Sequence, residues 1–90
     1  MKNTTHLYKA ENVNLPFGIF VVVVEETCEE DARVAISEVV HKEFNLRPGS
    51  FRINEVVKTT RKIVKNMYEA KGCANYNEEK HQWAWITRKD

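Results

Sequence analysis

GIFVVVVEE, residues 18–26, is the stretch that decides the fold, because it places six consecutive apolar residues between a glycine and two glutamates. A short valine-rich run with such boundaries is typical of a β-strand that is buried on both faces. Successive side chains of a strand point to opposite faces, so Phe20, Val22 and Val24 share one face and the odd-numbered residues share the other. Both faces of strand 19–24 therefore need a cover.

The residues that follow this strand predict a helix over 28–45. Thr27 and Glu30 have the spacing of a capping box, and acidic residues 29–31 lie at the positive end of the helix dipole. Apolar residues then recur at helical spacing, namely Ala32, Ala35, Ile36, Val39, Val40 and Phe44. This helix is expected to pack its apolar stripe on the sheet.

Four further stretches have the composition of strands or of a loop. Residues 5–11 alternate loosely before the turn-rich NVNLPFG and are expected to form a strand, and residues 50–53 are a possible short strand. Residues 81–88, HQWAWITR, alternate cleanly and place Trp83 and Trp85 on one face of a predicted strand. The polar residues 73–79, CANYNEE, are expected to form a loop.

Residues 54–71 are compatible with two structures. A helix is favoured, because Asn54 can cap its start, Gly72 can close its end, and apolar residues follow a helical ladder at Val56, Val57, Thr60, Ile63, Val64, Met67 and Tyr68. The alternative is a β-hairpin that turns near Thr59 and Thr60, since the valines and threonines lower the helix propensity.

These elements predict one α+β domain over residues 1–90, in the order β-β-α-(β)-α-β. We expect a small antiparallel or mixed sheet with two helices packed on it. If both helices share one face, the second face of strand 19–24 remains open. A second copy of the chain would then cover it, whereas helices divided between the two faces would give a closed monomer.

Composition limits the function classes. The net charge of +1 gives no general attraction to nucleic acid or to acidic membranes, and the longest apolar run, six residues, is far too short to span a bilayer. Two cysteines in a chain of 90 residues, with no apolar leader at the N-terminus, indicate a cytoplasmic protein with free thiols rather than a disulfide scaffold.

The sequence offers no convincing catalytic, metal or cofactor site. The histidines and cysteines are isolated and lack the spacing of metal ligands. An acidic cluster at Glu25, Glu26 and 29–31 is explained largely by the helix start, and its carboxylates oppose the thiolate that Cys28 would need as a nucleophile. We therefore expect a protein that is not an enzyme and binds no cofactor.

Charge is distributed unevenly along the chain. From Glu11 to Glu43 there are eight acidic and two basic residues, a balance of −6, whereas from Arg47 to Lys71 there are seven basic and two acidic residues, a balance of +5. If residues 54–71 are helical, one face carries a basic stripe that could contact phosphates, formed by Lys58, Arg61, Lys62 and Lys65.

The leading functional hypothesis is a non-catalytic binding or regulatory protein that acts through a protein interface, as a homodimer. The expected interface residues are apolar side chains of the two best strands, namely Phe20, Val22, Val24, Trp83 and Trp85. One alternative is a nucleic-acid-binding accessory protein that uses the basic helix 54–71. Another is an inhibitor whose acidic face, from Glu25 to Asp31, occupies the groove of a basic enzyme.

Both cysteines, Cys28 and Cys73, are predicted to be free thiols. A thiol titration of the denatured, unreduced protein should therefore find two thiols per chain. A count of zero would show that the two cysteines are bonded, and would overturn the cytoplasmic assignment.

Overall fold

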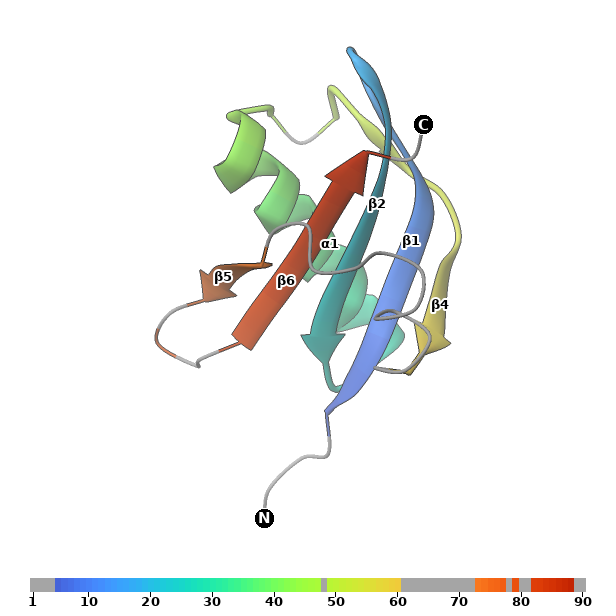
Figure 1. The fold of residues 1–90 in the computed structure, drawn as a ribbon, viewed down its shortest axis with the longest axis vertical. Coiled ribbons are helices and arrows are strands. Elements are labelled where there is room, and N and C mark those ends of the chain that lie inside the picture. Colours follow the sequence, from blue (N-terminus) through green and yellow to red (C-terminus); the bar gives the residue numbers. More distant parts are fainter. Residues whose placement is uncertain (1–4, 48, 61–72, 78, 80–81, 89–90) are drawn as a thin grey trace.

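The computed structural model describes residues 5–47, 49–60, 73–77, 79 and 82–88. Within them, one helix and six strands follow one another along the chain (Figure 1). Their bounds are β1 His6–Leu15, β2 Gly18–Glu26, α1 Glu29–Phe44, β3 Arg52–Ile53, β4 Val56–Thr59, β5 Cys73–Asn77 and β6 Gln82–Arg88.

The strands form a single sheet, and every strand pair in the described part of the chain is antiparallel. The order across the sheet is β3-β1-β2-β6-β5. Strand β4 also pairs with β1, at a different position along β1 from the short β3. The valine-rich β2 therefore lies at the centre, between β1 and β6. Helix α1 crosses behind the sheet and covers one face of it (Figure 1).

The predicted fold class, a sheet with two packed helices, is wrong. Among the described residues there is one helix, and most of the chain is strand. Of the helix predicted over 54–71, Val56 to Thr59 form β4, which pairs with β1 from Ala10↔Val56 to Leu7↔Thr59. Asn54, Glu55 and Thr60 belong to neither a helix nor a strand, and residues 61–71 lie outside the described residues.

The physical reason for this error lies in the side chains of β4. Valine and threonine lose rotamer freedom in a helix and pack well on a pleated surface. Val56 is 3% exposed in the core. The burial of this side chain stabilises the strand at this position. For these four residues the alternative of a β-hairpin was closer to the structure than the favoured helix.

A second correction concerns the polar residues after Gly72. The predicted loop 73–79 contains β5, which pairs with β6 from Cys73↔Trp85 to Asn77↔Gln82. Backbone hydrogen bonds to one neighbouring strand can hold such a segment at a sheet edge without an apolar pattern. The strand predicted over 81–88 is confirmed as β6, and the strand predicted over 5–11 is confirmed but continues to Leu15.

A β-bulge explains why β1 alternates poorly in the sequence. Ala10 pairs with Val22 and Val13 pairs with Phe20, so β1 uses one more residue than β2 over this interval. Ala10 and Val13 consequently both face α1, although they are three residues apart. The side-chain amide of Asn54 donates a hydrogen bond to the Asn12 carbonyl at 3.0 Å, which ties the segment between β3 and β4 to the bulge.

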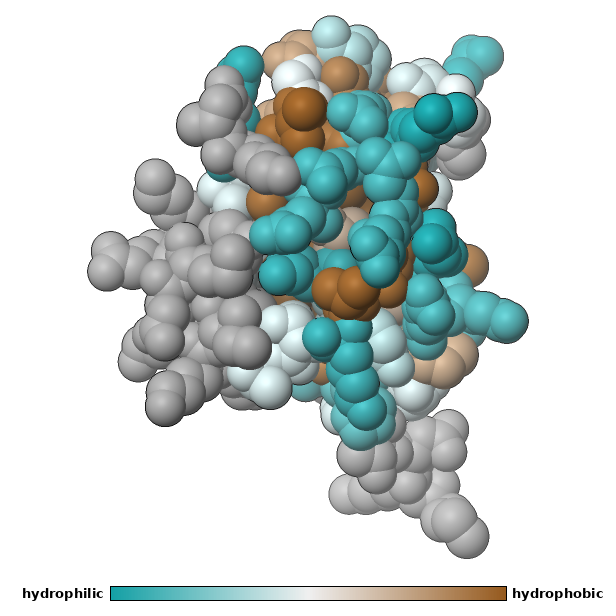
Figure 2. All heavy atoms as spheres, turned by 90° about the vertical axis from the view of Figure 1, so that its right-hand side faces the viewer, coloured by the Kyte–Doolittle hydropathy of each residue, from teal (hydrophilic) through white to brown (hydrophobic). Residues whose placement is uncertain are grey.

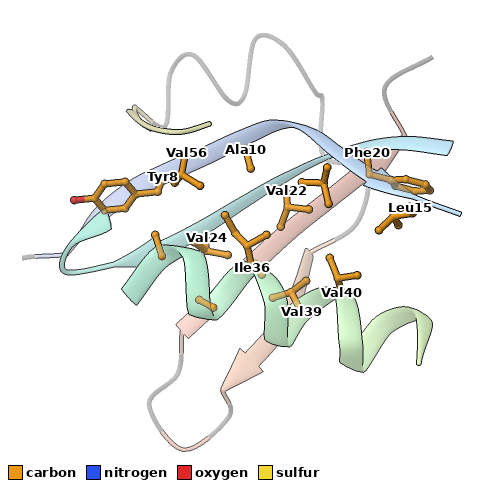
Figure 3. Close-up of a cluster of buried hydrophobic side chains, with 14 residues drawn as sticks. Tyr8, Ala10, Leu15, Phe20, Val22, Val24, Ile36, Val39, Val40 and Val56 are labelled. Atoms are coloured by element: carbon orange, nitrogen blue, oxygen red, sulfur yellow. The ribbon is translucent and has the colours of Figure 1, made fainter. Parts of the chain in front are cut away.

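The main core lies between α1 and the sheet (Figure 3). Val22 and Val24 point from β2 toward Ile36 and Val40 of the helix, and all four are fully buried. Phe20 is 9% exposed and belongs to the same cluster. The structure therefore places Phe20, Val22 and Val24, expected at a protein interface, in the interior of a single chain.

The opposite face of β2 carries a second, smaller cluster of buried side chains, Leu7, Val21, Val23 and Trp85. Val21 and Val23 are only 2% and 1% exposed. A partner is therefore not required to bury these two valines. The counting argument for a homodimer through an open sheet face loses its basis.

The helix predicted over 28–45 is confirmed at 29–44, but its start differs in detail. Cys28 is the N-cap residue and makes no side-chain capping bond, so the capping box of Thr27 and Glu30 does not form. Instead, the Thr27 hydroxyl donates to the Asp31 carboxylate at 3.3 Å. At the other end, Asn45 adopts the left-handed conformation (φ 55°) that commonly terminates a helix.

Shortening a core side chain should destabilise the protein strongly. Ile36→Ala, at a fully buried position, is expected to lower the free energy of unfolding by about 2–5 kcal/mol, because it leaves a cavity under the sheet. Val34→Ala, at a position 59% exposed on the same helix, should change it by less than about 0.5 kcal/mol. Urea denaturation followed by circular dichroism measures both, and equal midpoints would contradict the placement of the core.

Candidate protein-interaction site

The two ends of the fold carry different kinds of side chain. At the lower end in Figure 1, β2 finishes and α1 begins, which brings together the acidic end, defined as Glu25, Glu26, Glu29, Glu30 and Asp31. At the upper end lie the β1–β2 turn and the C-terminus of β6. We define the tip as Phe17, Ile19 and Arg88.

An aromatic cluster supports the tip. Phe17, in the turn, is 47% exposed, yet its ring packs edge-on against Phe20 and Phe44 at centroid distances of 5.6 and 5.2 Å. Phe20 and Phe44 are in turn 5.2 Å apart, so the three rings contact one another pairwise. Such T-shaped contacts are favourable beyond the area they bury. The exposed ring is thus held in place from the core and from the last residue of α1.

Arg88 fixes the turn from the neighbouring strand. Its Nη2 donates a hydrogen bond to the Phe17 carbonyl at 3.3 Å, and its backbone pairs with Phe20. Gly18 has φ 153°, and a Cβ built there would lie 3.3 Å from Arg88 Nη2. A side chain at position 18 would therefore be strained and would crowd the guanidinium. The glycine allows the arginine to lie against the turn.

The other face of the tip repeats the combination of an apolar residue and an arginine. Ile19 is 43% exposed and pairs with Asn14, which pairs on its other side with Arg52. Three neighbouring strands place Ile19 and Arg52 about 10 Å apart, given the usual spacing of about 4.8 Å between strands. Figure 2 also shows apolar atoms at the surface of this upper end.

The sequence indicates the turn that forms the tip, but it does not indicate the contacts that Phe17 makes there. Residues 15–18, LPFG, indicate only a turn, and an aromatic residue inside a tight turn is hard to bury there. That Phe17 meets Phe44 depends on the crossing of α1, which the turn itself does not specify.

The helical residues of the acidic end are more exposed to solvent than its strand residues. Glu29, Glu30 and Asp31 are exposed in the first turn of α1, whereas Glu25 and Glu26 are partly buried. Cys28 is a free thiol, exposed at the helix start. For Cys73, the side chain lies outside the described residues, so the prediction of two free thiols stands as a prediction.

Of the other residues singled out from the sequence, Lys58 and Trp85 have described side chains. Lys58 is exposed on β4, at the sheet edge that faces the viewer in Figure 2, and Arg61, Lys62 and Lys65 lie outside the described residues. Trp85 is 6% exposed in the smaller buried cluster rather than at a surface. Trp83 belongs to β6, and its side chain lies outside the described part.

The described residues contain no cluster of three or more histidine, cysteine or acidic side chains arranged to hold a metal ion. Within the same residues, α1 is too short and too polar to cross a membrane. Comparison of the chain with protein-family models, with curated proteins and with solved structures found no match.

The aromatic cluster should behave as an energetically coupled unit. Phe17→Ala is expected to lower the free energy of unfolding by about 1–2 kcal/mol, because two ring contacts are lost. In a double-mutant cycle, Phe17→Ala and Phe44→Ala should couple by about 0.5–1.5 kcal/mol.

Val56→Ala, on β4, supplies the comparison for this cycle. Combined with Phe17→Ala it should be additive within about 0.5 kcal/mol, because the two side chains share no ring contact. Chemical denaturation of the single and double variants measures both couplings. Additivity in the aromatic pair as well would mean that Phe17 is not held by Phe44.

Proposed function

We propose that this chain is a non-catalytic binding protein that acts through a protein interface at the tip. The observation that carries the proposal is a half-exposed aromatic ring, Phe17, that is fixed by two ring contacts and by the bond from Arg88 to its carbonyl. Aromatic residues and arginine are enriched at the centres of protein interfaces.

Rigidity is what makes this ring a suitable anchor. Binding costs free energy when side chains and loops must be ordered, and a side chain already held by its own fold avoids part of that cost. Ile19, on the other face of the turn, is a second exposed apolar residue at the same end of the sheet. The tip therefore offers an exposed aromatic ring close to an arginine, which suits a protein partner that carries carboxylates.

The two alternatives gain less support. The nucleic-acid hypothesis depends on a basic helix that aligns Lys58 with Arg61, Lys62 and Lys65, and the last three residues lie outside the described part of the chain. Lys58 is on a strand, so the helical spacing that would align it with the other three does not apply at its position. An inhibitor that uses the acidic end would bind a basic protein, and the experiment below separates this case from the first.

The test is a quantitative affinity purification from cells of the source organism, with this chain as bait. Phe17→Ser should deplete the specific partner at least fivefold, because it removes the anchor ring. Val57→Ser is the matched control, since Val57 is also an exposed apolar residue, 39% exposed, but lies on β4 away from the tip. Thermal unfolding of each bait confirms that both variants are folded.

The two baits give opposite outcomes if the tip is the interface. A partner retained by Val57→Ser and lost with Phe17→Ser supports the proposal. A partner retained by both variants, but lost when Glu29 and Glu30 are changed to lysine, supports the acidic-end alternative and contradicts the tip.

A further inference from the structure

We draw no further inference here: the strongest candidate, the outer edge of β4 with its exposed Val57, is a strand edge with one partner in the described sheet, and nothing among the described residues shows what covers it.

Discussion

The burial of a strand that is apolar on both faces is the constraint on which the rest of this structure depends. Val21 to Val24 cannot lie at a sheet edge or on an open face without exposing large apolar side chains, at a cost of about 1.5–3 kcal/mol each. The fold satisfies this requirement by placing β2 between β1 and β6 and by covering one face with α1. The other elements are arranged around that central position.

The elements that contact this strand most directly were also the easiest to predict. β2, α1 and β6 each carry a periodic apolar pattern, because each buries a continuous surface. β4 and β5 are edge elements with one strand partner apiece in the described sheet, and their sequences carry little periodicity to detect. For Val56 to Thr59 the sequence pattern favoured a helix, and only the buried place beside β1 made them a strand.

The candidate site was predicted less well than the fold, for a related reason. Phe20, Val22 and Val24 were expected at an interface because a strand alone does not reveal how its second face is covered. The tip, in contrast, is formed by a turn, a helix terminus and a strand end that meet only in three dimensions. Phe17, Phe44 and Arg88 are distant in sequence, and no local pattern connects them. The charge imbalance along the chain was visible from the sequence, and the fold brings part of its acidic segment together where β2 ends and α1 begins.

The position of β6 has a consequence for how this chain is synthesised. Phe20 pairs with Arg88, so the central strand receives its second neighbour only after almost all of the residues up to 88 have left the ribosome. Until then the nascent hairpin of β1 and β2 exposes an unpaired valine-rich edge, which is the kind of segment that pairs with other chains and aggregates. A ribosome that stalls between the codons for α1 and β6 would release a fragment of this kind. Such a fragment would leave open to other chains an edge that β6 covers in the finished fold.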